Sequence, residues 1–107
     1  MPDPSPRALA ARARAAQRWY VYMLLCDNGA IYTGIARNVA ARYALHVAGT
    51  GARYTRANPP RRVLAKFACR DQSEASRLEA AIKRLPASDK RKLIGTSGAA
   101  ARKFVMG

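Results

Sequence analysis

Acidic residues are scarce in this chain, which has 6 Asp and Glu against 20 Lys and Arg and a formal net charge of +14. The interval between Asp27 and Asp71 holds no acidic residue, whereas arginine and lysine recur along it. Folded proteins usually mix the two signs over their surface, and basic residues interleaved with aromatic ones are typical of nucleic-acid-binding faces. We therefore expect a polyanionic partner, and the alternative is a composition that is merely basic throughout.

Cysteine and long apolar runs are scarce as well. Cys26 and Cys69 lack the CxxC spacing and the clustered histidines of a zinc site, so we expect two buried thiols in a reducing compartment. No apolar run approaches the roughly 20 residues that span a bilayer. The first residues also lack the continuous apolar segment of a secretory signal. These absences argue against a membrane partner and favour a cytoplasmic protein.

The length of 107 residues allows one domain with a single core. Alanine is concentrated near the two ends, so we place the core domain at residues 19–94. Residues 1–18 are expected to form a flexible basic arm rich in alanine and arginine, and a weak similarity to organelle transit peptides is the alternative interpretation. Residues 95–107 are small and polar, and we expect a flexible tail there.

Three strands are predicted from short runs of β-branched and aromatic residues. Residues 19–26 and 31–35 flank the turn Asp27-Asn28-Gly29, where Asn-Gly favours positive φ angles, and are expected to pair as an antiparallel hairpin. Residues 63–69 are the third strand. With the helices described next, this order predicts an α+β fold in which helices flank a three-stranded antiparallel sheet, in the sequence β-β-α-β-α-α.

The first predicted helix begins after Asn38, a favourable N-cap, and runs to about residue 47. Three of its residues recur at helical spacing and are expected to face the core: Ala41, Leu45 and Ala48. Arg42 and His46 lie one turn apart and share a different face. The residues that follow, 49–58, are expected to form a basic loop.

Two further helices are predicted after the third strand. Asp71, with Glu74 three residues later, resembles a capping box that would begin the longer of the two. The apolar side of that helix consists of Ala75, Leu78, Ile82 and Leu85. Pro86 separates it from a short helix over residues 87–94.

Five residues on these elements have side chains suited to phosphodiester cleavage: Tyr22, Tyr32, Arg42, His46 and Glu79. That reaction needs an activated water and stabilisation of charge around the phosphorus, which a divalent metal and a guanidinium can supply. Glu79 is the candidate metal ligand, since one carboxylate together with water and substrate oxygens suits Mg²⁺. The alternative for Glu79 is a surface ion pair with Lys83.

The other four residues also have structural explanations. Arg42 could hold the phosphate through two hydrogen bonds, or it could be one more surface arginine. His46, the only histidine, could bind phosphate or move a proton, although a lone histidine on a helix is more often a half-buried packing residue. Tyr22 and Tyr32 could be ordinary sheet aromatics, because a tyrosine with a pKa near ~10 is a poor base unless a cation lowers it.

Taken in order along the chain, these residues resemble the GIY-YIG nuclease superfamily, in particular its small stand-alone members. Tyr20-Val21-Tyr22 and Tyr32-Thr33-Gly34 are similar to the two tripeptides of that family. Arg42 matches its arginine and Glu79 its metal-binding glutamate, while His46 matches a histidine of several branches. The resemblance covers residues 19–94.

This resemblance implies a hydrolysis that uses one Mg²⁺ or Mn²⁺ ion. In the family's scheme the tyrosine at Tyr22 activates water, and Tyr32 supports the site through its hydroxyl. Arg42 would then stabilise the phosphate, and Glu79 would hold the metal. The chain departs from the pattern at Tyr20, where the family has glycine, and at Thr33, where it has isoleucine. It also has no asparagine beyond Asn58, although many members carry one after the glutamate helix.

Larger relatives obtain specificity from an added DNA-binding or zinc domain, and we expect no such domain here. We therefore expect contacts with nucleic acid from the basic loop and its surroundings: Arg37, Arg53, Tyr54, Thr55, Arg56, Lys83 and Arg84. A protein partner could also supply specificity. The predicted function is a metal-dependent endonuclease on DNA (branched, damaged or single-stranded) in repair or recombination. The alternatives are a non-catalytic nucleic-acid-binding module and an accessory subunit that docks on RNA or a ribosome.

Overall fold

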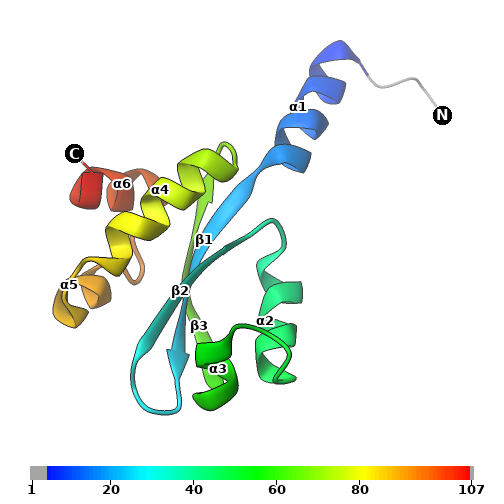
Figure 1. Ribbon diagram of the computed structural model, residues 1–107. Helices are drawn as coiled ribbons and strands as arrows, with labels where there is room; N and C mark the ends of the chain where they lie inside the picture. Colours follow the sequence, from blue (N-terminus) through cyan, green and yellow to red (C-terminus); the bar gives the residue numbers. More distant parts are fainter. Residues whose placement is uncertain (1–4, 107) are drawn as a thin grey trace.

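The computed structural model describes residues 5–106, and Figure 1 shows a central sheet with helices on both faces. The strands are β1 (Trp19–Cys26), β2 (Ile31–Ala36) and β3 (Pro60–Cys69). Their order is β2-β1-β3, and β1 is antiparallel to both neighbours. The predicted α+β class and the three-stranded antiparallel sheet are confirmed, although β3 begins three residues earlier than expected.

The helices of the described chain are α1 (Pro6–Gln17), α2 (Val39–Val47), α3 (Arg53–Ala57), α4 (Gln72–Lys83), α5 (Ala87–Lys92) and α6 (Gly98–Met106). In Figure 1, α4 and α6 lie on one side of the sheet, α2 and α3 lie on the other, and α1 extends away from the body. The predicted N-caps are present: Asn38 Oδ1 accepts from the amide of Ala41 at 3.0 Å, and Asp71 Oδ1 from that of Glu74 at 2.9 Å.

Alternation along β1 divides the core into two parts, because successive side chains point to opposite faces of a sheet. Val21 and Met23 pack with Phe67 and with the buried side of α4, including Leu78 and Ile82. Tyr22 and Leu24 face the other side, where Ala36, Val39, Tyr32 and Tyr43 complete a smaller cluster. Tyr22 therefore lies beneath α2 and α3, while the larger apolar core lies beneath α4 and α6.

The face of α2 that packs on the sheet differs from the prediction. Ala41 and Ala48 are exposed, and Leu45 keeps 47% of its surface exposed, whereas Val39 and His46 are buried. Val39, Tyr43 and His46 recur at i, i+4 and i+7, so they form a second stripe at helical spacing that competes with the expected one. The sheet buries this second stripe because it brings His46 onto the hydroxyl of Tyr22.

Three segments without predicted helices are helical, and the first is residues 6–17 of the expected arm, which form α1. Residues 53–57, expected to be loop, form α3, and residues 98–106, expected to be a tail, form α6. Ala101 of α6 is fully buried, and Val105 packs on the same cluster, so the small residues of this segment have a partner that composition alone did not reveal. Residues 1–4 of the expected arm and residue 107 of the expected tail lie outside the described residues.

Cys26 and Cys69 are buried free thiols, as predicted. Within residues 5–106, no helix is both long and apolar enough to cross a bilayer.

Candidate active site

Tyr22 is the centre of the candidate site, and the hairpin register explains its position. It lies on β1 directly opposite Gly34 of β2, and its side chain is 2% exposed. A Cβ atom at Gly34 would stand 2.5 Å from the Tyr22 hydroxyl oxygen and 2.7 Å from Cζ. The absent side chain therefore leaves the space in which the tyrosine ring lies. The phenol of Tyr22 thus approaches the backbone at Gly34 closely.

His46 reaches the same hydroxyl from α2. Its Nε2 lies 2.8 Å from the Tyr22 oxygen, and its Nδ1 lies 2.6 Å from Oγ1 of Thr55 on α3. The histidine is 2% exposed. Gly51 backs onto the ring, since a Cβ there would collide with Nδ1 and lie 2.9 Å from Cγ. Thr55 and Gly51 hold the imidazole in place, although the sequence predicted a nucleic-acid contact for Thr55 and no role for Gly51.

Two further tyrosines extend the aromatic cluster toward the surface. The ring of Tyr32 meets the His46 ring edge-on with centroids 5.2 Å apart, and lies 6.3 Å from the Tyr22 centroid. Tyr54 of α3 is nearly parallel to Tyr32, at an angle of 14° and a centroid distance of 6.3 Å. Asn28, in the hairpin turn, donates from Nδ2 to the Tyr54 hydroxyl at 3.0 Å. The hairpin turn thus supports the exposed end of the cluster.

The charges around Tyr22 come from Arg42 and Glu79. Burial raises the pKa of the Tyr22 hydroxyl above its ordinary value, Tyr32 adds to that rise, Arg42 opposes it, and Glu79 contributes a smaller increase. Burial also lowers the pKa of His46, and the positive charge of Arg42 lowers it further. At neutral pH the hydroxyl therefore keeps its proton and the imidazole is uncharged. Of the five residues predicted for chemistry, Tyr22, Tyr32 and His46 lie against one another, whereas Arg42 and Glu79 are linked to the buried hydroxyl only by the effect of their charges on its pKa.

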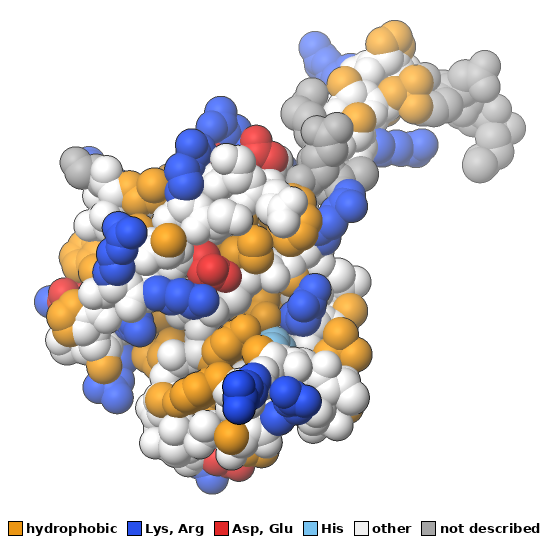
Figure 2. Space-filling model, in the orientation of Figure 1, with side chains coloured by type: hydrophobic (Ala, Val, Ile, Leu, Met, Phe, Trp, Pro, Cys, Tyr) orange, Lys and Arg blue, Asp and Glu red, His pale blue; other side chains and the backbone are white. Residues whose placement is uncertain are grey.

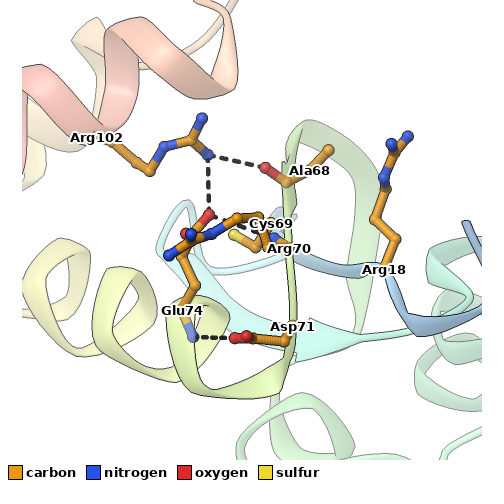
Figure 3. Close-up of a pocket in the computed structure, with 7 residues that line it drawn as sticks. All are labelled: Arg18, Ala68, Cys69, Arg70, Asp71, Glu74 and Arg102. Carbon is orange, nitrogen blue, oxygen red and sulfur yellow. Dashed lines mark hydrogen bonds and ion pairs between the residues drawn. The ribbon is translucent and has the colours of Figure 1, made fainter. Parts of the chain in front are cut away.

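Glu79 and Glu74, the two carboxylates of α4, have different surroundings. Glu74 lies at the helix N-terminus in a hollow of about 500 Å³, where Figure 3 shows it between two arginines. Its oxygens are 2.7 Å from Arg70 Nε and 3.5 Å from Arg102 Nη1. Burial alone would raise the pKa of Glu74, but the hydrogen bonds and charge of the arginines hold it below its ordinary value. Glu74 is thus a structural ion-pair partner.

Glu79 is partly exposed, with 23% of its side chain accessible, and its ion-pair partner is a lysine one turn later, whose Nζ (Lys83) lies 3.5 Å away. Among the described residues, no group of three or more His, Cys, Asp and Glu side chains converges as a metal cage would require. A lone carboxylate oxygen donor suits Mg²⁺ or Mn²⁺, which keep several waters and bind phosphate oxygens. The donor set fits such a metal with Glu79 as its protein ligand.

The surface around the cluster is basic, and Figure 2 shows lysine and arginine side chains on both sides of an apolar band. A hollow of about 260 Å³ beside Tyr32 is lined by Tyr54, Lys83 and Lys90. Another of the same volume is lined by Arg37 and Arg42. The other predicted contact residues are exposed, with one exception: Arg53, Arg56 and Arg84 are open to solvent, but Thr55 is fully buried. The prediction that Thr55 contacts nucleic acid is wrong, because its hydroxyl faces His46.

The sequence of this domain is similar to a known family model and to known proteins. A sequence model described as the GIY-YIG catalytic domain matches residues 18–92. A UPF0213 protein of Xanthomonas axonopodis pv. citri is 50% identical over 76 residues, which are 71% of this chain and 74% of that protein. One from Cupriavidus pinatubonensis is 49% identical over 69% of this chain and 82% of its own length.

The solution NMR structure of a UPF0213 protein of Bacillus halodurans is 39% identical, with a TM-score of 0.47, and the match covers 72% of this chain and 82% of that one. The sequence relationship is strong enough to assign the family, because the GIY-YIG match extends over the sheet, α2, α3, α4 and α5. This chain belongs to the GIY-YIG family, whose catalytic domain indicates a nuclease.

Proposed function

We propose that this protein is a metal-dependent endonuclease that hydrolyses phosphodiester bonds in DNA. The observation that carries the proposal is the buried contact of 2.8 Å between the Tyr22 hydroxyl and His46 Nε2. In such a pair, the tyrosine oxygen can accept the proton of an attacking water while the histidine accepts the proton of the tyrosine. Any buried phenol needs a hydrogen-bond partner, but the partner here is an imidazole, which can also accept a proton.

The proton path in the proposed reaction starts at water and ends at His46. As the water oxygen bonds to phosphorus, its proton moves to the Tyr22 oxygen, and the Tyr22 proton moves to Nε2 of His46. The raised pKa of Tyr22 keeps its hydroxyl protonated, and a protonated phenol is a poor base on its own. The neutral imidazole removes that difficulty, since it accepts the phenol proton while the phenol accepts the proton of water.

Arg42 and Glu79 have electrostatic roles in the proposal. Arg42, exposed on α2, would bind the non-bridging oxygens of the scissile phosphate through a planar pair of N–H donors. Glu79 would hold one Mg²⁺ or Mn²⁺ ion. Such a metal, when bound, stabilises negative charge on the phosphate and on the departing oxygen.

The net charge of +14 supports a nucleic-acid substrate. We propose DNA, in a branched, damaged or single-stranded form, and a role in repair or recombination in the cytoplasm, with a protein partner that adds specificity. The exposed basic residues on α3 and at the end of α4 would contact the phosphates on either side of the cleaved bond: Arg53, Arg56, Lys83 and Arg84. Tyr32 and Tyr54 line one hollow together with Lys83 and Lys90.

Nicking of supercoiled plasmid and cleavage of branched and single-stranded DNA test the proposal, with Mg²⁺ or Mn²⁺ and with EDTA. We expect metal-dependent cleavage that falls by roughly 100-fold or more in Glu79→Ala and in Tyr22→Phe, the scale at which one group that stabilises a transition state contributes. Asp89→Asn is the matched control, because Asp89 also forms an ion pair with a lysine one helical turn away, at 3.3 Å from Lys92.

DNA affinity, measured by fluorescence anisotropy, separates the two classes of function. Tight binding without cleavage on every substrate would favour a nucleic-acid-binding module over an enzyme. Cleavage that survives in Glu79→Ala would contradict the metal site that we assign to Glu79.

A further inference from the structure

Thr55 is a fully buried polar residue whose only described side-chain contacts lie inside the candidate site. Its Oγ1 is 2.6 Å from Nδ1 of His46 and 3.0 Å from the carbonyl oxygen of Ala52, the N-cap residue of α3. The side chain is 0% exposed, so it cannot contact a substrate on the surface. Any effect of its side chain on the reaction must therefore be exerted through the imidazole.

A count of protons determines the direction of these hydrogen bonds. The Thr55 hydroxyl has one hydrogen, and the Ala52 carbonyl can only accept, so their contact at 3.0 Å requires Thr55 to donate. The lone pairs of Oγ1 then face Nδ1, and at 2.6 Å the nitrogen must carry a proton and donate. A neutral imidazole with its proton on Nδ1 has a lone pair on Nε2. That lone pair faces the Tyr22 hydroxyl, which donates to it at 2.8 Å.

One contact favours the opposite tautomer. The backbone N–H of Ala52 points to Nδ1 from 3.5 Å, and it would need a lone pair on that nitrogen. This distance exceeds the usual range of about 2.7–3.2 Å for an N–H···O bond, whereas the Thr55 contact is short. If Thr55 donated to Nδ1 instead, Nε2 would hold the proton and point it at Tyr22. The histidine could then not accept a proton from the phenol.

We propose that Thr55 is a positioning residue that holds His46 in the Nδ1–H tautomer, so that Nε2 can take the Tyr22 proton as water is activated. This rests on the proposed nuclease function. The step is balanced within the site: the O–H bond of Tyr22 breaks and the N–H bond at Nε2 forms. The resulting imidazolium keeps its Nδ1–H bond to Thr55, and the phenolate oxygen receives the proton of the attacking water.

The imidazole tautomer can be measured directly, because His46 is the only histidine in the sequence. In ¹⁵N-labelled, metal-free protein at neutral pH, two-bond ¹H–¹⁵N correlation spectra distinguish the protonated ring nitrogen from the one with a lone pair. We expect Nδ1 to be the protonated nitrogen. A wild-type spectrum with the proton on Nε2 would overturn the proposal, whether or not the protein cleaves DNA.

Two substitutions connect the tautomer to the reaction. Thr55→Val keeps the shape but removes the acceptor for Nδ1–H, so the proton should move toward Nε2. We expect DNA cleavage to fall roughly 10- to 100-fold, the usual cost of losing a partner that orients a reacting imidazole, with unchanged DNA affinity. Thr55→Ser retains the hydroxyl and should restore both the tautomer and the rate.

Thr50→Val is the matched control, since Thr50 lies in the same α2–α3 segment and its exposed hydroxyl donates to the Leu45 carbonyl at 3.2 Å. It should change neither the tautomer nor the rate. If Thr55→Val alters neither of them, the proposal is wrong even though the enzyme is active. If the wild type does not cleave at all, the nuclease function fails, while the spectrum still decides the assignment of the tautomer.

Discussion

At the scale of single residues, the site depends on side chains that are absent as much as on those that are present. A Cβ at Gly34 would overlap the Tyr22 ring, and a Cβ at Gly51 would overlap the His46 ring. Neither glycine has a positive φ angle. Glycine is therefore required at these two positions because a side chain would not fit, and not because of the backbone conformation. The hydrogen bond between the two rings depends on both vacant positions, because a displacement of either ring would lengthen it.

Gly34→Ala tests this requirement. The new methyl would stand 2.5 Å from the Tyr22 hydroxyl oxygen, so the ring must move away from His46. We expect a loss of DNA cleavage together with a loss of about 1–3 kcal/mol in the free energy of unfolding, as for other overpacked cores. Chemical denaturation and the nicking assay measure the two effects.

Gly98→Ala is the control glycine, because its Cβ would lie 3.4 Å from the nearest described atoms, at ordinary contact distance. It should leave cleavage unchanged. Full activity in Gly34→Ala would show that the Tyr22 ring can be displaced without consequence, and so would remove the basis of the proposed proton path.

At the scale of elements, α4 contains both a structural ion-pair network and the candidate metal ligand Glu79. Its first turn is held by the Asp71 cap and by Glu74 between Arg70 and Arg102, while Glu79 lies further along the same helix. Arg102 also donates to the carbonyl oxygen of Ala68 at 2.9 Å, which attaches α6 to β3. This ion-pair network keeps the N-terminus of α4 in place on the sheet.

Glu74→Gln is expected to destabilise the fold in a pH-dependent way. The folded-state pKa of Glu74 is lowered, so its carboxylate stabilises the native state above the unfolded-state pKa of about 4.3, and this contribution is lost as the pH falls through the folded-state value. The difference in free energy of unfolding between wild type and variant should be about 1 kcal/mol at neutral pH and should shrink in acid.

Urea denaturation across this pH range measures the effect. Asp27→Asn is the control, because its ion pair with Arg61 at 3.1 Å is solvent-exposed and should contribute little at any pH. A destabilisation by Glu74→Gln that does not vary with pH would indicate lost packing instead of lost charge.

At the scale of the whole molecule, the charge is spread over an elongated body with extents of 51 × 35 × 21 Å. Twenty cations against six anions on such a surface predict a long electrostatic contact with a phosphate backbone. The question for function is whether the contact is concentrated beside Tyr22 or distributed over the entire surface.

The salt dependence of DNA binding distinguishes these possibilities. The logarithm of affinity should fall linearly with the logarithm of salt concentration, and Arg53→Gln and Arg56→Gln on α3 should each reduce the slope by about 1. Lys103→Gln, an exposed cation on α6, should leave the slope unchanged. Equal effects from all three variants would mean that binding is not centred on the candidate site.

The sequence by itself determined what depends on neighbouring residues: the hairpin and its turn, and the caps at Asn38 and Asp71. The family resemblance drawn from the sequence motifs was confirmed, and the catalytic roles stay predictions. The tertiary structure decided which stripe of α2 is buried, that Thr55 faces inward, and that residues 98–106 form a docked helix. These outcomes depend on contacts between residues that are distant in the sequence, such as Tyr22 and His46, 24 positions apart. Such residues become buried only when whole helices and strands pack together.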